Sequence, residues 1–465
     1  MSRTEINPAI DSVRVHAKDL LVLALPIGFS LIAQKVINVT DAVMLGSMGA
    51  HALAAGGLAT TVFFTIMTIM HGVMSSLTVL MSNARGAGRT AELPTLYGTA
   101  ILLAALLSFL VFAAMTVLGP LLLAWGIEPA LARDVGRSSE VLRWAAPAAL
   151  LGLSLMRAAL PPMGGARILM VVSLGAMIVN GFLNYGLIHG YWGLPALGFV
   201  GSATATTLTL WLTAIALFFI VHRRNAFHPM TQGMKVRAPV LKKMLLIGGP
   251  VSVTLGVEAG VFLAAGLSIS GLHPEALAAH QIAFSIVDAI FMVPLALASA
   301  ANVRVGYWAG AGKARQIIRA GWVAIIGGVL LMATSSVILL TTPLSIIGLY
   351  IDLDDPANAY TASIAVSLLA VAALFQIGDG VQTIAAACLR ALQDTKVPMF
   401  LAAFGYWAIA FPLGLWLATG FGLGAIGIWQ GLAVGLLTVA GFLVSRFAIL
   451  CRSARLTCPV VTAQA

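Results

Sequence analysis

Long apolar stretches are the feature that most constrains the fold of this chain. About twelve of them run for roughly 20 residues or more, which is the length that a helix needs to cross about 30 Å of hydrocarbon. Hydrocarbon offers no hydrogen-bond partner to open backbone groups, so each stretch is predicted to be a helix. Only 9% of the residues are charged, and a mean hydropathy of +1.00 leaves no room for a sizeable soluble domain. The sequence therefore predicts an all-α integral membrane protein with twelve transmembrane helices.

The twelve predicted spans fall into two groups of six. They are expected at residues 20–46, 57–82, 93–118, 141–160, 168–189, 197–221, 244–270, 276–301, 320–343, 361–388, 398–418 and 424–448. Residues 1–19 are polar and mixed in charge. The first group predicts an N-lobe at residues 1–221, and the second predicts a C-lobe at residues 244–465 that ends in a cytoplasmic tail. A cytoplasmic linker is expected at residues 222–243.

An internal repeat relates the two groups. An offset of 224 residues aligns Pro26 with Pro250, and the same offset aligns residues 86–89 with residues 310–313. Each repeat holds an even number of spans, so both halves enter the membrane from the same side, as in the parallel class of transporter repeat. This pattern predicts two pseudo-symmetric six-helix lobes with a central cleft, and alternating access by rocking of one lobe against the other.

The basic residues indicate the orientation of the chain. Cytoplasmic loops collect Lys and Arg. When the N-terminus is placed inside, only Arg133, Arg137 and Arg143 of the 26 basic residues fall outside, Lys35 lies within a span, and Arg157 belongs to the inside set. The net charge of +10 is therefore a topology signal rather than a sign of nucleic-acid binding. We expect a multi-pass protein of the inner or plasma membrane with both termini cytoplasmic.

Four acidic residues lie inside predicted spans: Asp41, Glu258, Asp288 and Asp379. An ionisable group at membrane depth costs at least about 2.5–3.5 kcal/mol on insertion scales and marks a functional path by default. The alternative is a carboxyl that stays protonated or pairs with a neighbouring base and has no transport role. The two interpretations weigh equally for Asp288, and the functional one is favoured for the other three.

The first half combines one acid with neutral oxygen ligands. Asp41 lies near the outer end of its span, and Asn180 and Asn184 are four residues apart, so they share one helix face. Thr206 is expected at a similar depth. Such an all-oxygen set is the kind that hard cations prefer, and burial also allows the carboxyl to hold a proton. The alternative is that the amides and the hydroxyl only hydrogen-bond one helix to another.

The second half carries two acids near the middle of their spans, Glu258 and Asp379. If both face one cavity, they titrate as a coupled pair. Such a pair is suited to exchanging a proton or cation against a cationic substrate.

Short motifs spread over nearly the whole chain carry a family resemblance. They are Leu25-Pro26, Ala33-Gln34, Thr40-Asp41-Ala42-Val43-Met44-Leu45-Gly46, Asn184-Tyr185, Ala278-Ala279-His280-Gln281, Asn302-Val303-Arg304-Val305-Gly306, Gln376-Ile377-Gly378-Asp379 and Leu389-Arg390. Together these motifs resemble those of the multidrug and toxic compound extrusion (MATE) transporters of the NorM-type branch.

The resemblance implies secondary active export of small organic, often cationic, compounds against inward Na⁺ or H⁺. It implies no enzymatic activity and no cofactor or bound metal beyond the coupling ion, and two fused halves leave no need for a dimer. Motif by motif it assigns a hinge to Pro26, and the remaining residues to two sites. The N-lobe cation site is Asp41, Asn180, Asn184 and Thr206, and the acidic pair of the C-lobe cavity is Glu258 and Asp379.

Five further residues are candidates for lining the cleft: Gln34, Lys35, Gln281, Asp288 and Phe375. Phe375 stands where some NorM-type relatives carry Tyr. Lys35 lies inside the first span, and one hypothesis makes it an internal counter-ion to Glu258 or Asp379.

Two other functions remain open at this point. A flippase for a lipid-linked saccharide precursor belongs to the same superfamily, but its phosphate-bearing substrate favours basic residues along the spans. A membrane-embedded enzyme is the less favoured alternative. Its best support is the acidic cluster of Asp352, Asp354 and Asp355, in a predicted outer loop.

Overall fold

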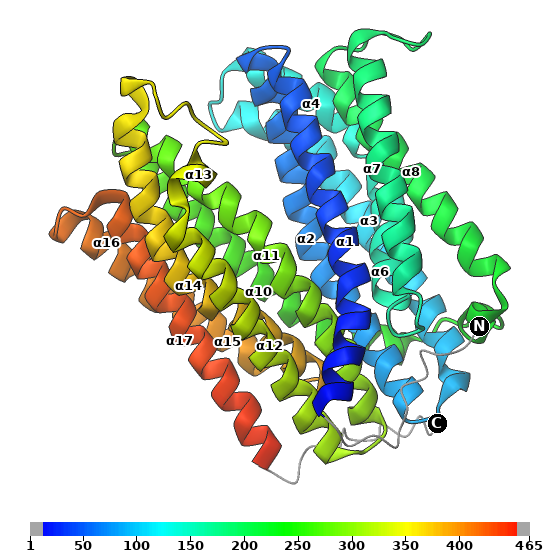
Figure 1. The fold of residues 1–465 in the computed structure, drawn as a ribbon. Coiled ribbons are helices and arrows are strands. Elements are labelled where there is room, and N and C mark those ends of the chain that lie inside the picture. The colour runs from blue at the N-terminus through cyan, green and yellow to red at the C-terminus, as the bar shows by residue number, and fades with distance from the viewer. Residues whose placement is uncertain (1–12, 453–465) are drawn as a thin grey trace. The chain divides into compact units, whose positions relative to one another are not determined.

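A computed structural model describes residues 13–452, most of which are helical (Figure 1). Within this range, eleven helices are long and apolar enough to cross a membrane, and a shorter apolar helix covers Ala145–Ala159. The short helix lies in the fourth predicted span, so the prediction of twelve membrane helices is confirmed. The two termini, which are predicted to be cytoplasmic, lie outside the described residues.

The chain packs into two compact units. The N-unit comprises residues 29–252, and the C-unit comprises residues 13–28 together with 253–452. The boundaries fall inside two continuous helices, α1 (Val13–Gly46) and α10 (Ala238–Ser270). Residues 28 and 252 are separated by the same 224-residue offset that aligns Pro26 with Pro250. The lobe limits at residues 221 and 244 follow chain order rather than packing and stay a prediction.

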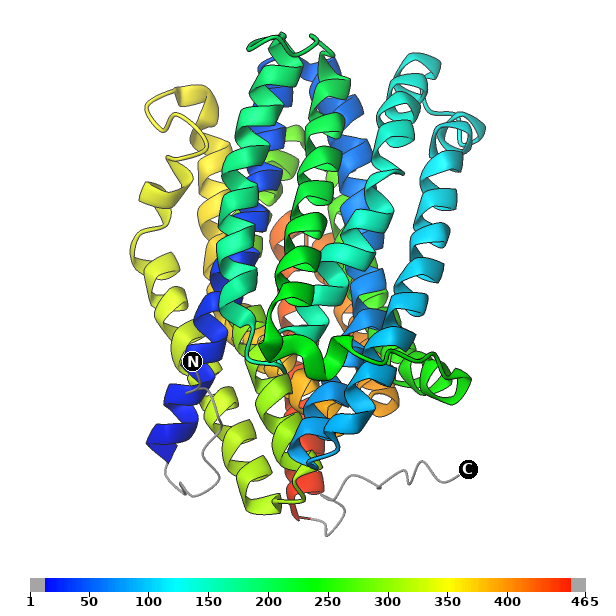
Figure 2. The same cartoon turned by 90° about the vertical axis from the view of Figure 1, so that its right-hand side faces the viewer.

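The N-unit is built from apolar helices and short connecting turns. Its elements, besides parts of α1 and α10, are α2 (Ala50–Gly86), η1 (Thr90–Glu92), α3 (Leu93–Ala124), α4 (Pro129–Leu142), α5 (Ala145–Pro147), η2 (Ala148–Ser154), α6 (Leu155–Ala159), α7 (Ala166–His189), α8 (Phe199–Arg223), η3 (Asn225–Phe227) and α9 (His228–Thr231). Helices α7 and α8 run antiparallel and side by side, as Figures 1 and 2 show. They carry three of the predicted cation-site residues.

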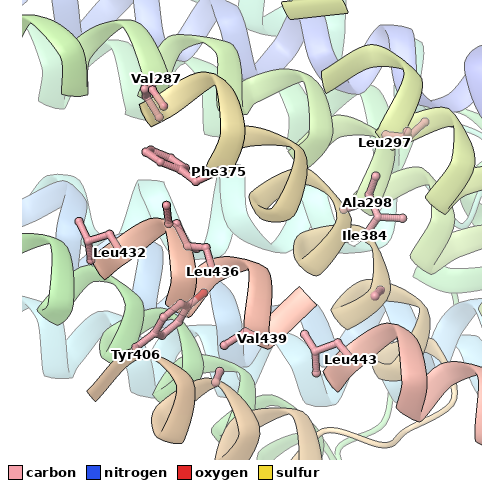
Figure 3. Close-up of a cluster of buried hydrophobic side chains, with 14 of the residues drawn as sticks. Val287, Leu297, Ala298, Phe375, Ile384, Tyr406, Leu432, Leu436, Val439 and Leu443 are labelled. Atoms are coloured by element: carbon pink, nitrogen blue, oxygen red, sulfur yellow. The ribbon is translucent and has the colours of Figure 1, made fainter. Parts of the chain in front are cut away.

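In the C-unit, α14 is the central helix. The remaining elements are α11 (Pro274–Gly310), α12 (Ala314–Thr341), α13 (Pro343–Ile347), η4 (Pro356–Asn358), α14 (Ala359–Ala391), α15 (Lys396–Ala403), η5 (Phe404–Ala410), α16 (Phe411–Gly420) and α17 (Gly424–Arg452). Helix α14 packs against α11, α12 and α17. Figure 3 shows part of the core, where Phe375 of α14 lies beside Leu436 of α17, and Ile384 of α14 lies beside Ala298 of α11. Burial on three sides makes α14 a firm support for Asp379.

Helix α1 (Val13–Gly46) is already helical at the first described residue, seven residues before the predicted span. The extra turns are polar, and they are held by residues from α11 and α12. The carboxylate of Asp19 accepts a hydrogen bond from Arg304 Nη1 at 2.7 Å, and the His16 ring lies 2.7 Å from Gln316 Oε1. Arg304 is almost fully buried, so this pairing offsets the cost of removing its charge from water. Tertiary pairing, not hydropathy, therefore stabilises the helical residues before the predicted span.

The fourth span is not one regular helix. The predicted stretch 141–160 contains α5, η2 and α6, and η2 is a π-helix of seven residues. A π-helix bonds residue i to residue i+5, so it turns the residues after it relative to an α-helix. The orientation of α6 therefore follows from η2.

Glycines bring α16 and α17 into backbone contact. Gly427, Gly431 and Gly435 are four residues apart on α17 and share one face. A Cβ at Gly431 would lie 2.3 Å from the Cα of Gly414 on α16. Small residues at such positions let membrane helices approach closely and gain van der Waals contact. This crossing has no space for any side chain at residue 431.

We predict that Gly431→Ala destabilises the C-unit. The new methyl group meets backbone rather than a flexible side chain, and overpacking of this kind costs about 1–3 kcal/mol. The matched control is Gly441→Ala on the same helix, where a Cβ meets nothing within 4 Å and where Ala favours the helix. Thermal unfolding of purified protein in detergent should show a lower midpoint for Gly431→Ala only. Equal midpoints for both variants would refute the close crossing.

Candidate functional site

Asp41 is the centre of a buried polar site in the N-unit. Its Oδ2 accepts a hydrogen bond from Thr206 Oγ1 at 2.8 Å, and its Oδ1 accepts one from Asn184 Nδ2. Asp41 is 2% exposed, and Asn184 is fully buried. The carboxylate thus has two donors but no basic side chain bonded to it, which leaves its charge unneutralised.

The amides beside Asp41 have unused hydrogen-bonding capacity. Asn180 lies close enough to interact with the carboxylate, yet neither its Nδ2 nor its Oδ1 has a partner that meets normal hydrogen-bond geometry. Asn184 Oδ1 is also buried without a partner. Buried polar atoms are nearly always paired in proteins. Two free amide oxygens next to a carboxylate are ligands of the type that hard cations prefer.

A small cavity lies beside this site. It is lined by residues of α1, α2, η2, α6, α7 and α8: Gln34, Ile37, Phe64, Leu153, Arg157, Ser173, Ala176, Asn180, Thr206, Thr209, Leu210 and Thr213. Asn180 and Thr206 therefore face both Asp41 and the cavity. A largely apolar lining with a few convergent polar groups is the usual composition of a site for small organic molecules.

Arg157 of α6 is the one charged residue in the lining of this cavity. The positive-inside pattern places it among the predicted cytoplasmic basic residues, and its partly buried guanidinium belongs to the cavity wall. The positive-inside pattern depends on the number of charges at the ends of spans and not on the direction of a side chain, so this position in the cavity wall could not be predicted from the sequence.

The two acids of the second half meet at one amide in the C-unit. Gln382 Nε2 lies 3.0 Å from Asp379 Oδ1 and 3.3 Å from Glu258 Oε1, and it donates to both. Asp379 and Gln382 are buried on α14, and Glu258 is partly buried on α10. The structure therefore brings the predicted pair to a single polar site. Their role in transport stays a prediction.

The π-helix η5 completes the acidic site. Tyr406 of η5 is 2% exposed, and its hydroxyl donates to Gln382 Oε1 at 2.8 Å. The neighbouring Trp407 donates from Nε1 to the carbonyl oxygen of Val257, one residue before Glu258. Gln382 was missed although it lies three residues after Asp379, on the same helix face. Tyr406 could not be predicted from the sequence, since the direction of its side chain depends on the π-helix η5.

We predict that Tyr406→Phe and Gln382→Met each destabilise the protein by about 1–3 kcal/mol. Each change leaves buried polar groups of the acidic site without a partner. The double variant should cost less than the two single costs together, because both changes remove the same hydrogen bond. Unfolding of purified protein in detergent measures all three. Tyr360→Phe, at an exposed position, serves as the control. Strict additivity would show that Tyr406 and Gln382 do not interact.

The residues predicted to line the cleft or to form the hinge lie in different parts of the structure. Gln34 lines the cavity, and its neighbour Lys35 is partly buried on α1. Gln281 is exposed and Asp288 is partly buried, both on α11. Phe375 is buried in the C-unit core against the ring of Trp429. Pro26 lies inside α1, which continues as a helix on both sides of it. Their roles in a cleft or hinge, and that of Lys35 as a counter-ion, stay predictions.

The acidic cluster behind the enzyme alternative forms a turn. Asp352 Oδ1 accepts from the backbone N–H of Asp354, and Asp355 Oδ1 accepts from that of Ala357. Within residues 13–452 no group of three or more His, Cys, Asp or Glu side chains could hold a metal ion. The cluster's carboxylates thus stabilise the loop before α14.

Comparison with known proteins agrees with these features. The chain is 50% identical to the probable multidrug resistance protein NorM of Burkholderia mallei over 93% of this chain and 92% of that one. It is 48% identical to the multidrug resistance protein NorM of Burkholderia vietnamiensis, with 96% of each covered. Its fold is similar to an outward-facing multidrug resistance MATE family transporter, with a TM-score of 0.85 at 17% identity, over 94% of this chain and 97% of that one.

The family model named MatE matches both halves, at residues 26–186 and 250–416. These ranges contain the Asp41 site up to Asn184, as well as Glu258, Asp379, Gln382 and Tyr406. The resemblance drawn from short motifs is confirmed: the chain belongs to the MatE family.

Proposed function

We propose that the protein is a secondary active multidrug efflux antiporter. It exports small organic, often cationic, compounds in exchange for Na⁺ or H⁺ by alternating access. The relatives named NorM are multidrug resistance proteins by name, and they match nearly the full chain. No cofactor and no enzymatic step is part of this proposal.

The Asp41 site is the observation that carries the proposal. A carboxylate at membrane depth without a basic partner bonded to it is costly unless a proton or cation joins it. Asn184 and Thr206 hold both of its oxygens in place, and Asn180 extends from the site to the cavity. A coupling ion bound at Asp41 and a substrate in the cavity would therefore lie next to the same side chains, so that the binding of one would affect the binding of the other.

Both coupling ions are compatible with this site. A proton needs only the carboxylate, whereas Na⁺ needs several oxygen ligands. Asp41, Thr206 and the free amide oxygens of Asn180 and Asn184 supply such a set. The acidic pair of the C-unit offers a second place for a cation, with Gln382 between the two carboxylates.

The positive-inside pattern supports an inner or plasma membrane protein with cytoplasmic termini. We propose that one chain is the functional unit, because two repeats already supply both halves of a transporter.

One observation favours the flippase alternative, and another speaks against it. Arg157 is a basic residue in the N-unit cavity, as a phosphate-bearing substrate requires. Yet it is one charged residue among twelve in the lining. A saccharide diphosphate would need several cations to replace its hydration. The lining of the cavity therefore does not favour the flippase.

Reconstituted vesicles test the proposal. Efflux of ethidium is followed by fluorescence while a Na⁺ gradient and a pH gradient are imposed separately. Efflux that requires one of the two gradients supports the antiporter and identifies its ion. Efflux that is independent of both gradients, or its absence from well-folded protein, would overturn the proposal and favour the flippase.

A further inference from the structure

The predicted cytoplasmic linker carries basic residues and no acidic ones. The sequence contains no Asp or Glu between Glu140 and Glu258, and the linker lies inside this stretch. Its basic residues are Arg223, Arg224, Lys235, Arg237, Lys242 and Lys243. Within residues 13–452, neither Arg223 nor Arg224 forms an ion pair. These two charges can therefore be balanced by an anion from outside the protein.

The last turn of α8 pairs two basic side chains with aromatic rings. The Arg223 guanidinium carbon lies 4.5 Å from the ring centroid of Phe219, a cation–π contact. The ring centroids of His222 and Phe218 are 3.9 Å apart. The carbonyl oxygen of Phe218 can only accept, so His222 donates to it from Nδ1 at 2.9 Å. These contacts hold both basic side chains along the helix rather than extended into solvent.

The two phenylalanines end an apolar stripe on the surface of α8. This α8 stripe consists of five exposed side chains at helical spacing: Leu208, Leu212, Ile215, Phe218 and Phe219. Exposed apolar side chains on a membrane helix contact lipid tails, and basic side chains at the end of such a helix lie at headgroup level. Arg223 therefore lies where lipid tails meet lipid headgroups.

The chain after α8 is fixed in position by burial. Phe227 of η3 and Met230 of α9 are buried, and α9 packs against α3. The backbone N–H of Phe227 donates to the carbonyl oxygen of Arg224 at 3.0 Å. Arg224 therefore stays beside the end of α8, and a ligand meets two guanidinium groups at one depth.

We propose that the end of α8 binds an anionic phospholipid of the cytoplasmic leaflet, with its phosphate on Arg223 and Arg224 and one acyl chain along the α8 stripe. A guanidinium offers a phosphate two parallel N–H donors. A soluble phosphate gains only this charge contact, whereas a lipid also gains the apolar contact beside it. The bound lipid holds α8, the helix that carries Thr206, at a fixed depth. No part of this inference depends on the proposed antiport.

Lipid titration of purified protein in detergent tests the inference without transport. The probes are dioleoyl phosphatidylglycerol, which is anionic, and dioleoyl phosphatidylcholine, which has the same acyl chains and no net charge. The midpoint of thermal unfolding is followed as each lipid is added to the micelles. Wild-type protein should be stabilised at a lower mole fraction of phosphatidylglycerol than of phosphatidylcholine.

In Arg223→Gln, the mole fraction of phosphatidylglycerol that gives half of the maximal shift should rise about fivefold, the factor that one basic side chain near an anionic surface gives. Arg223→Lys keeps the charge but loses the planar fork, so its rise should be smaller. Phe219→Leu keeps the charge and the stripe but removes the ring under the guanidinium, and a rise of about twofold is expected. The phosphatidylcholine titration should be the same for all variants, which shows that each is folded.

The control variant is Lys396→Gln, which removes an exposed, predicted cytoplasmic charge from the C-unit. It should leave both titrations unchanged, and a rise equal to that of Arg223→Gln would overturn the inference in favour of a diffuse effect of net charge. Equal responses of wild-type protein to the two lipids would also overturn it. Glycerol phosphate, which has the headgroup anion but no acyl chains, should not stabilise the protein. Stabilisation by it to the same extent would show a site for soluble anions instead of a lipid site.

Discussion

Asp41→Asn should reduce gradient-driven efflux by about 100-fold or more, which corresponds to about 2.7 kcal/mol or more. The substitution keeps the shape of the side chain but removes the only ionisable group bonded to Asn184 and Thr206. It also replaces one carboxylate oxygen by an amide nitrogen. This nitrogen is a donor, and it faces a donor from either Asn184 or Thr206. The site therefore loses both its charge and one of its two hydrogen bonds.

The fold should survive this change. An isolated buried carboxylate costs solvation free energy, so its removal offsets the lost hydrogen bond. Thermal unfolding in detergent should confirm a midpoint close to that of the wild type, and initial efflux rates from vesicles measure the transport defect. The control is Glu140→Gln, at an exposed position of the same unit. Efflux at half the wild-type rate or more in Asp41→Asn would remove Asp41 from the coupling path.

Asp379→Asn should reduce gradient-driven efflux by a similar factor of about 100, for a different reason. Here the geometry can be preserved, because the oxygen of the new amide still accepts from Gln382 Nε2. What changes is the number of charges: Glu258 and Asp379 together can hold two protons or one shared cation, and the variant retains a single carboxylate. A loss of efflux in this variant therefore reports the loss of one charge and not a change in the structure of the site.

Substrate binding distinguishes the two acids. Asp379 belongs to the C-unit, whereas the cavity belongs to the N-unit. Asp379→Asn should therefore leave the binding of a fluoroquinolone in detergent unchanged while efflux is lost. The control is Glu275→Gln at the exposed start of α11. A parallel loss of binding and efflux in Asp379→Asn would contradict this separation of roles.

Hydropathy predicted the helices well because the membrane constrains their length. Predicted spans 168–189 and 424–448 correspond to α7 (Ala166–His189) and α17 (Gly424–Arg452). The predicted spans differ from the observed helices where packing, rather than hydropathy, determines the structure. Helix α1 gains two polar turns since Arg304 and Gln316 bond them. The fourth span is interrupted by a π-helix, and no hydrophobic period distinguishes a π-helix from an α-helix.

Helical spacing predicted those residues of the candidate site that share one face of a regular helix. Asn180 and Asn184 share a face at a spacing of four, and both are fully buried beside Asp41. Gln382, three residues after Asp379, carried the same kind of signal. Tyr406 and Arg157 carried none, because each follows or lies within a π-helix that sets its direction. Residues whose orientation depends on irregular backbone require the structure.

The acidic site of the C-unit also has a consequence for how the protein is made. Gln382 follows Glu258 by 124 residues, and Tyr406 comes later still. At synthesis rates of 5–20 residues per second, Glu258 enters the membrane about 6–25 s before the amide that will bind it exists. During that interval the nascent chain holds an acid without its native partner. Until α14 arrives, only a proton or water can lower the cost of this acid at membrane depth.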